Sequence, residues 1–501
     1  MLLRRHSGGG IGASGCRVNK KGEFRFEQDS LGEMQIPIGA YWGIRTARAR
    51  DAFAINGLKP HPKIVDGTVL TKKAAALANG QIGILTAQVS RSIVQAADEV
   101  LNGQWRDQFV VDPYQVGGSF SHNANVNEVL ANRAAEILGS SAGTYALVHP
   151  DNHVNLGQSA NDVFPTAMRL AILLMLRELE PVLLDLERLL RRKSLEFDKV
   201  VKVGRTHLRD SAPITLGQEF NAYGSSVERS YRRIVEASHS LFELNIGGTS
   251  VGTGLNADPA YISLVVEKLS QLAGLQLKPA EDYFRLTQSM ADFVEFSSGL
   301  KELAVELNKI ANDIRLLNSG PRAGLGELAL PPLLAEPAPT MPESLPPRFN
   351  PALAECVSMV ALQVIGNDLV VTLAAQSGQL EMNVMMPSII HNILQSMELL
   401  KQVLLPFSQR CISGIVANAA RCRELLETSG MVTSTLITEI GYEKAAAIAR
   451  QSQETGRSIR DLLIEQDLVA SEQLDRLLQF KSMTQPGRQP GTTSNTGSTG
   501  S

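Results

Sequence analysis

Cysteines are scarce in this 501-residue chain, and so are long apolar runs. The four cysteines form no CxxC pair, which argues against a structural zinc site and a disulfide framework and favours a reducing cytoplasm. The apolar stretch LAILLML at residues 170–176 is flanked by charged residues and is much shorter than the about 20 residues that a membrane span needs. We therefore expect a cytoplasmic protein without a membrane-spanning segment.

Charge of one predominant sign is also lacking. The net charge is −3, and acidic and basic residues are mixed along the chain. Proteins that bind nucleic acid or a membrane surface carry a one-sided charge field instead. A small molecule is therefore the expected partner, and neither nucleic acid nor a membrane is expected.

Aromatic residues make up only 5% of the chain, and alternating β-branched patterns are rare. Apolar residues recur instead at three- and four-residue spacing, the period of an amphipathic helix. The stretches with this period are residues 71–98, 167–197, 225–243, 287–317, 353–376 and 391–404. Helices of this length need neighbours to cover their apolar faces, so we predict an all-α helix bundle that continues into other subunits.

Composition sets three stretches apart from the predicted helices. Residues 1–22 lack the apolar region of a secretory signal and are predicted to be a disordered leader. The Gly-, Ser- and Thr-rich residues 483–501 are predicted to be a disordered tail. The proline-rich residues 331–351 are predicted to be an extended loop.

Polar stretches between the predicted helices are the candidates for a binding pocket. The most informative one, HPDNHVNLGQSAND, concentrates amide and hydroxyl side chains, which bind the carboxylates of a small acid without adding charge. The glycine-rich GGTSVGTG has neither dinucleotide-binding nor P-loop spacing and is interpreted as a tight turn that supports the site. Carboxylates with metal-ligand spacing are absent from the sequence, so neither a metal nor another cofactor is expected.

Eight segments, in the same order, resemble the aspartase/fumarase superfamily over roughly residues 23–480. They are RFEQDSLGEMQIPIGAYWGIRTARA, LTKKAAALAN, WRDQFVVDPYQ, NEVLANRA, HVNLGQSANDVFPTA, VGRTHLRDSAPITLGQEF, GGTSVGTGLNADP and QVIGND. WRDQFVVDPYQ and the C-terminal ETGRSIRDLLIEQDLVASEQLDRLL are most similar to the aspartate ammonia-lyase branch. The resemblance implies an all-α, three-domain fold with a long central bundle. The implied domains are an N-terminal lyase domain at residues 23–160, a central helical bundle at 161–420 that includes the Pro-rich loop, and a small helical C-terminal domain at 421–482. The resemblance also implies a homotetramer in which loops of three subunits form each active site.

The chemistry implied by the resemblance is the reversible anti-elimination of ammonia from L-aspartate to give fumarate. In such enzymes a loop serine is the general base, and hydrogen-bond donors stabilise the carboxylate whose charge grows. His207 is carried over as a catalytic donor of this kind. The substrate-binding residues carried over by position are Ser159, Asn161, Thr206, Asn125, Asn127 and Asn350. Ser159 and Asn161 also precede a predicted helix, where we expect them to cap the helix and bind substrate at once.

The chain departs from the family in its signature loop. The pattern GSSxMPxKxNP corresponds here to AEPAPTMPESLPPRFNP, which lacks the Gly-Ser-Ser triplet. Ser344 is the only serine between Ser319 and Ser358 and is therefore the candidate base. Arg348 takes the place of the lysine, and its guanidinium can bind a carboxylate in a bidentate manner.

Two further substitutions remove hydroxyl groups. Phe120 and Ala160 stand where the family has threonines, in the segments SFS and QSAND. Three functions are therefore open. They are an aspartate ammonia-lyase with a rebuilt loop, a class II fumarase-like hydratase or a lyase for another substituted dicarboxylate, and a catalytically silent assembly subunit.

Overall fold

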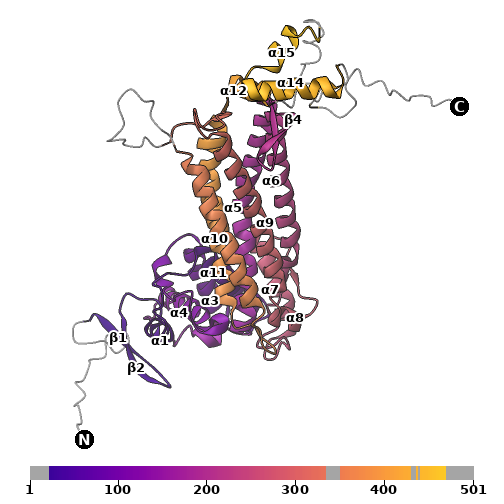
Figure 1. Cartoon of the computed structure of the whole chain (residues 1–501). Helices are drawn as coiled ribbons and strands as arrows, with labels where there is room; N and C mark the ends of the chain where they lie inside the picture. The colour runs from indigo at the N-terminus through magenta and orange to yellow at the C-terminus, as the bar shows by residue number, and fades with distance from the viewer. Residues whose placement is uncertain (1–21, 334–349, 430–435, 438–439, 470–483, 485–501) are drawn as a thin grey trace, which may run out of the picture. The chain divides into compact units, whose positions relative to one another are not determined.

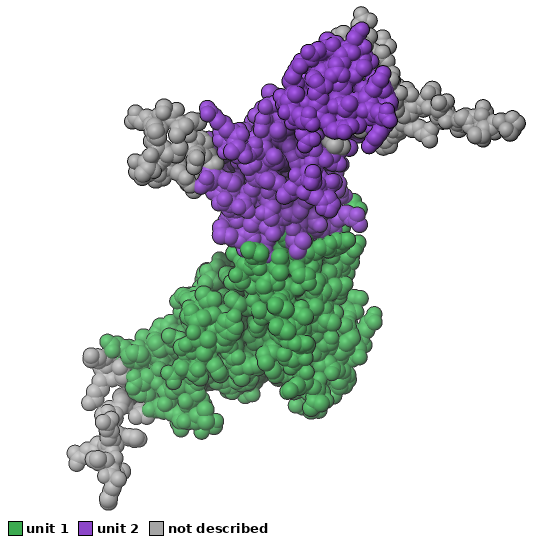
Figure 2. All heavy atoms as spheres, viewed as in Figure 1, with its two compact units in different colours: residues 1–180, 232–304, 362–401 green, residues 181–231, 305–361, 402–501 purple. Residues whose placement is uncertain are grey.

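The computed structural model describes residues 22–333, 350–429, 436–437, 440–469 and 484 (Figure 1). Most of these residues are helical, and every sheet that they form has two strands, so the predicted all-α class is confirmed. The chain divides into two compact units, coloured separately in Figure 2. Unit 1 comprises residues 1–180, 232–304 and 362–401, and unit 2 comprises residues 181–231, 305–361 and 402–501. The domain boundaries implied by the resemblance stay a prediction.

The helices follow the predicted periodicity with three corrections. They are α1 Ile44–Ala52, α2 Pro62–Gln81, α3 Ala87–Leu101, α4 Phe120–Ile137, α5 Ala160–Glu196, α6 Leu216–Ser238, α7 Pro259–Ala273, α8 Tyr283–Gln288, α9 Ala291–Leu317, α10 Ala352–Ala375, α11 Met386–Pro406, α12 Ala419–Thr428, α14 Tyr442–Thr455 and α15 Ile459–Glu465. The stretch 71–98 is two helices, because Gly83 has a φ of 81° and Thr86 caps α3 by accepting from the amide of Val89. Helix α6 ends at Ser238, and residues 287–317 are divided between α8 and α9.

Unit 1 contains a core formed by α2, α3 and α4. Val69, Ile93 and Val129 are fully buried in it. Gly67 of α2 allows a close approach to α5, because a Cβ atom there would lie 2.5 Å from the carbonyl oxygen of Ala167. The antiparallel pair β1 (Phe24–Asp29) and β2 (Gly32–Pro37) and the short parallel pair β5 (Glu243–Leu244) and β6 (Lys278–Pro279) complete the unit.

Buried polar contacts fix α9, α10 and α11 together within unit 1. Asp368 of α10 accepts from the hydroxyl of Ser297 at 2.8 Å and from the ammonium of Lys301 at 2.7 Å. Asn367 donates to Gln395 and Ser396 of α11, at 3.0 Å in both cases. These contacts satisfy the polar groups that α10 would otherwise bury without partners.

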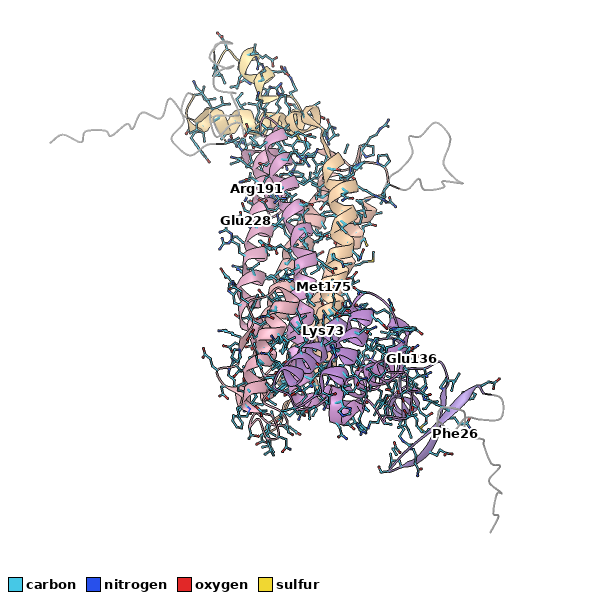
Figure 3. All side chains as sticks on the ribbon, turned by 180° about the vertical axis from the view of Figure 1, so that it is seen from behind. Phe26, Lys73, Glu136, Met175, Arg191 and Glu228 are labelled. Atoms are coloured by element: carbon cyan, nitrogen blue, oxygen red, sulfur yellow. The ribbon has the colours of Figure 1, made fainter. Side chains whose placement is uncertain are left out.

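Unit 2 contains the antiparallel hairpin of β3 (Val201–Thr206) and β4 (Arg209–Thr215). Val203 of this hairpin shares a core with Leu426 of α12, Ile448 of α14 and Leu462 of α15. A second short pair, β7 (Leu328–Ala329) and β8 (Val416–Ala417), is antiparallel. Arg191 of α5 and Glu228 of α6, labelled in Figure 3, form an ion pair of 2.9 Å.

The Pro-rich loop prediction at 331–351 falls mostly on residues 334–349, which lie outside the described residues, as do residues 1–21 and 485–501. In the described part of the predicted C-terminal segment 421–482, the structure has the helices α14 and α15.

Helix α10 is long and apolar enough to cross a membrane by length and composition, with a mean hydropathy of 1.7 in its most apolar window. One such helix is weak evidence, because packed helices pass the same test. Only 33% of that window is buried. The most exposed large apolar residues of the helix are Met359, Leu362, Leu369 and Leu373, and Gly366 lies between them with open space at its Cβ position. Their spacing alternates between three and four residues, which forms a single stripe along the helix.

Candidate functional site

A cavity of about 240 Å³ in unit 1 is lined by three polar segments. The first is the start of α4 with the preceding Gly117 and Gly118. The second is the segment from Asn155 to Asn161 that leads into α5. The third is the pair formed by Arg45 and Asp151.

The start of α4 presents one face to this cavity. Phe120, Asn123, Ala124 and Asn127 line it, at the spacing that places residues on the same side of a helix. Asn123 and Asn127 are 5% and 1% exposed, and the Oδ1 atom of each has no hydrogen-bond partner among the described residues. The Phe120 ring is 54% exposed and adds the only aromatic surface among the residues that line the cavity. The wall therefore combines unused acceptors with one apolar patch.

The start of α5 is organised by Ser159 and Asp162. The Ser159 hydroxyl accepts from the amide of Asn161 at 3.2 Å, a capping contact, while both residues also line the cavity. The Asn161 side chain donates to the carbonyl oxygen of Ser250 at 2.8 Å. Asn161, with its amide group, and Ser159, with its hydroxyl, both remain part of the cavity wall. Capping and lining are thus combined in the same residues.

Asp162 joins this helix start to the glycine-rich turn. Its Oδ1 accepts from the amide of Ser159 at 2.8 Å, and its Oδ2 accepts from the amides of Gly247 and Thr249, both at 3.0 Å. Complete burial raises the pKa of Asp162 to about 6, although these three hydrogen bonds act in the opposite direction. The interpretation of GGTSVGTG as a supporting turn agrees with these contacts.

Arg45 and Asp151 close another side of the cavity. Two hydrogen bonds, each 2.7 Å long, join the guanidinium to the carboxylate in a bidentate pair. The hydrogen bond to Asp151 is the main cause of a raised pKa for Arg45. Asp151 belongs to the π-helical turn Pro150–Val154 within the HPDNHVN stretch. Sequence reasoning did not select this pair, because its two members are far apart in the chain.

Comparison with known proteins identifies the family of this chain. The sequence matches a lyase family model over residues 32–366 and a fumarase C C-terminal model over residues 431–485. The chain belongs to the aspartase/fumarase superfamily. It is 45% identical to the aspartate ammonia-lyase of Bacillus subtilis (strain 168) over 470 residues, which are 94% of this chain and 98% of that protein. It is 42% identical to the class II fumarate hydratase of Thermosynechococcus vestitus, covering 92% of this chain and 97% of that protein.

Two solved structures of the superfamily have the same fold. The cobalt-bound fumarate lyase:delta crystallin from Brucella melitensis has a TM-score of 0.89 and 42% identity, over 92% of this chain and all of that one. The class II fumarase from Schistosoma mansoni has a TM-score of 0.85 and 33% identity, over 92% of this chain and 99% of that one. The resemblance deduced from the sequence is therefore confirmed.

Not every predicted site residue of this lyase lies at the cavity. Ser159, Asn161 and Asn127 line it, but Asn125 does not. The Asn125 side chain accepts from the amide of Val110 and donates to the carbonyl oxygen of Gln108, both at 3.1 Å. A residue two positions from Asn127 on a helix points to another side, which explains this difference.

Thr206 and His207 belong to unit 2, at the tip of the β3–β4 hairpin. Both are exposed, and His207 and Leu208 form its turn with φ values of 54° and 59°. Asn350 is exposed and lies two residues before the start of α10. Ser344 and Arg348 lie outside the described residues.

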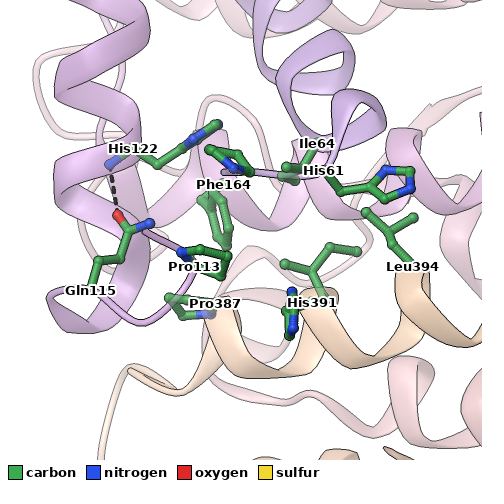
Figure 4. A pocket seen from close by; sticks show the side chains of 11 residues that line it. His61, Ile64, Pro113, Gln115, His122, Phe164, Pro387, His391 and Leu394 are labelled. Carbon is green, nitrogen blue, oxygen red and sulfur yellow. Dashed lines mark hydrogen bonds between the residues drawn. The ribbon is translucent and has the colours of Figure 1, made fainter. Parts of the chain in front are cut away.

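A second, smaller cavity of about 30 Å³ in unit 1 contains three histidines, His61, His122 and His391 (Figure 4). Burial is the main cause of a lowered pKa in all three, and it lowers the pKa of His122 to about 4. The backbone amide of His122 donates to Gln115, and its ring contacts the hydroxyl of Thr68 at 3.0 Å. Throughout the described part of the chain, no group of three or more His, Cys, Asp or Glu side chains is arranged to hold a metal ion. We interpret the three imidazoles as neutral packing groups.

Proposed function

We propose that this protein is an aspartate ammonia-lyase that catalyses the reversible elimination of ammonia from L-aspartate to give fumarate. The observation that carries the proposal is the 45% identity to the Bacillus subtilis aspartate ammonia-lyase over 94% of this chain. The polar cavity of about 240 Å³ supports it, since a small dicarboxylate fits such a volume and its carboxylates can accept from amide and hydroxyl groups.

The unused acceptors at the cavity favour an amine over a hydroxyl in the substrate. With the amides oriented as in the structure, the Oδ1 atoms of Asn123 and Asn127 are buried and unpartnered. Leaving such acceptors without a donor costs free energy. The ammonium of L-aspartate donates three hydrogen bonds, whereas the hydroxyl of malate donates only one. An amino acid therefore satisfies both acceptors at once.

In the proposed reaction, Ser344 removes the proton from the β-carbon of L-aspartate. The electron pair of that bond forms the double bond of fumarate, and the bond from the α-carbon to nitrogen breaks with its pair on nitrogen. Ammonia leaves and takes up a proton to give ammonium. Thr206 and His207 donate to the carboxylate whose charge grows, while Arg348 and Asn350 bind substrate carboxylate. Ser159, Asn161 and Asn127 contact the substrate from the cavity wall.

We also propose a homotetramer with shared active sites. The stripe on α10 supports this assembly, since Met359, Leu362, Leu369 and Leu373 are 63%, 64%, 59% and 49% exposed. With Gly366 between Leu362 and Leu369, their spacing alternates between three and four residues, the pattern by which one helix packs against another in a coiled coil. Exposed Thr206, His207 and Asn350 are then available to the cavities of neighbouring subunits.

A cytoplasmic location is part of the proposal. Cys356, Cys411 and Cys422 are free thiols, and burial raises the pKa of Cys411 and Cys422 to about 12. Free buried thiols accord with a reducing compartment.

The second candidate is a hydratase, which the 42% identity to a class II fumarate hydratase supports. Phe120 and Ala160 at the cavity also suit a lyase for a dicarboxylate with an apolar substituent. A catalytically silent assembly subunit is the third possibility, because the signature loop AEPAPTMPESLPPRFNP lacks the family's Gly-Ser-Ser triplet.

The test is the formation of fumarate from L-aspartate, followed by its ultraviolet absorbance, with L-malate assayed in parallel. We expect turnover of L-aspartate that Ser344→Ala abolishes and that Thr340→Ala, a matched loss of a hydroxyl in the same segment, retains. Turnover of L-malate alone would favour the hydratase. No turnover of either acid by a folded tetramer would contradict both enzymes and favour the silent subunit.

A further inference from the structure

Lys72 of α2 is a fully buried cation directly behind the cavity wall. Its ammonium donates to Oδ1 of Asn155 at 2.6 Å and to Oε1 of Gln158 at 3.0 Å. Both acceptors line the cavity of about 240 Å³. Lys72 is therefore separated from the cavity by a single layer of amide side chains.

The surroundings of Lys72 differ from those of the other buried lysines. Among the described residues, Lys193 and Lys202 are also buried. Lys193 forms an ion pair with Glu196, and Lys202 forms ion pairs with Glu219 and Glu327. Lys72 forms no ion pair with any carboxylate in the described part of the chain. Burying a cation without a counter-charge is costly, so an anion bound in the cavity would stabilise the charged form.

The contacts of Lys72 also organise the cavity wall. Oδ1 of Asn155 accepts from Asn123 at 3.3 Å as well as from Lys72, and its amide group donates to the carbonyl oxygen of Gln158 at 3.2 Å. The Gln158 amide donates to the carbonyl oxygens of Val154 and Leu156. Lys72 thereby holds the side-chain oxygens of Asn155 and Gln158, in the segment that directly precedes Ser159 and Asn161.

We propose that Lys72 is the buried positive charge of this site, which attracts the dicarboxylate and holds Asn155 and Gln158 in position for it. The inference rests on the proposed function, because a dicarboxylate provides the missing counter-charge. Ligand binding and the protonation of Lys72 then favour each other, as any two coupled equilibria do. Lys72 is a positioning residue, since it acts on the substrate through the amides and through its field.

The electrostatics of the buried site predict the pH at which the coupling between ligand binding and protonation of Lys72 can be measured. Burial lowers the pKa of Lys72 to about 7, and the charges of Asp162 and Asp151 partly oppose that effect. His122 of α4 also faces Lys72 and is neutral near pH 7, because its pKa is lowered to about 4. A bound dianion raises the pKa of Lys72, so binding at about pH 8 takes up a proton.

The experiment uses isothermal titration calorimetry of the full-length protein with succinate, a dicarboxylate that cannot eliminate ammonia. Titrations at about pH 8 in two buffers with different ionisation enthalpies give the number of protons taken up. We expect proton uptake by the wild-type protein. We expect Lys72→Met to weaken succinate binding on the order of tenfold or more and to abolish the uptake. Lys72→Arg should restore affinity without proton uptake, because arginine stays charged.

Lys73→Met is the matched control, because Lys73 is the neighbouring residue on α2 and pairs with Asp98 instead (Figure 3). It should bind succinate like the wild-type protein. A structural role alone would weaken binding in Lys72→Met without changing proton uptake, and that result would contradict the inference. Absence of uptake by the wild-type protein would also overturn it, even if Lys72→Met does not fold.

The calorimetry, combined with the assay of L-aspartate turnover, separates this inference from the proposed function. If the wild-type protein turns over L-aspartate and Lys72→Met takes up as many protons as the wild-type protein, the proposed lyase activity is supported and the role of Lys72 is contradicted. Proton uptake that depends on Lys72, in a protein that does not turn over L-aspartate, would support the charge site and contradict the lyase. A wild-type protein that does not bind succinate would contradict the charge site.

Discussion

Replacing two leucines of the α10 stripe by aspartate, in the double variant Leu362→Asp/Leu369→Asp, should dissociate the proposed tetramer. The two side chains are 64% and 59% exposed in the single chain. Complete burial of a leucine contributes about 1.5–3 kcal/mol, so covering the exposed part of each contributes roughly 1–2 kcal/mol. An interface with two-fold symmetry uses both leucines from both chains. The expected loss is then about 4–8 kcal/mol, which corresponds to roughly three to six powers of ten in the dissociation constant.

Sedimentation velocity over a range of protein concentrations measures this change directly. We expect the wild-type protein to sediment as a tetramer and the double variant as smaller species, with the same far-ultraviolet circular dichroism. Activity on L-aspartate should be lost together with the tetramer, since the proposed active site needs loops of neighbouring subunits.

Leu195→Asp is the matched control, because Leu195 of α5 is 79% exposed yet does not belong to the α10 stripe. It should remain a tetramer. A double variant that sediments like the wild-type protein would refute the assignment of the stripe as the subunit interface.

Three further predictions concern the cavity and its support. Asn127→Leu removes an unpartnered acceptor and should lower kcat/KM for L-aspartate by about tenfold to a hundredfold, since a hydrogen bond to a charged group contributes about 1.5–3 kcal/mol; an unchanged kcat/KM would contradict the assigned contact. Phe120→Thr restores a hydroxyl at a 54% exposed position and should raise kcat/KM for L-aspartate while leaving the melting temperature nearly unchanged; a fall in kcat/KM would favour a substrate with an apolar group. Burial raises the pKa of Asp162 from its ordinary value of 3.8 to about 6, so the folded state holds this proton more tightly than the unfolded chain does. The group's contribution to stability is therefore full below about pH 4 and is lost as the pH rises through about 6. Asp162→Asn should flatten that decline of the melting temperature between about pH 4 and 6, and a variant with the wild-type slope would show that another group titrates.

Local patterns predicted much of the helical architecture. Three- and four-residue periodicity located the long helices, because the residues on the buried face of a helix recur once per turn, every three or four positions. It did not predict the break between α2 and α3, which depends on the left-handed backbone of Gly83 and the cap at Thr86. Boundaries of this kind depend on one or two residues rather than on an average over many.

Within the candidate site, the amide- and hydroxyl-rich segment before α5 was recognisable from its composition alone. The different contacts of Asn125 and Asn127 were not, because they follow from the direction in which each side chain leaves α4. The pair of Arg45 and Asp151 and the contact of Lys72 with Gln158 join residues 106 and 86 positions apart in the chain. No pattern in the sequence singles them out.

The sequence by itself determined the helical class of this protein and its superfamily, because both are written in ordered motifs and in the period of apolar residues. Only the tertiary structure decided which polar side chains share a cavity, which buried charges have partners and which helix face is left uncovered. Burial and the distance between charges govern pKa values, hydrogen bonding and association, and both are set by segments that lie far apart in the chain and meet only on folding.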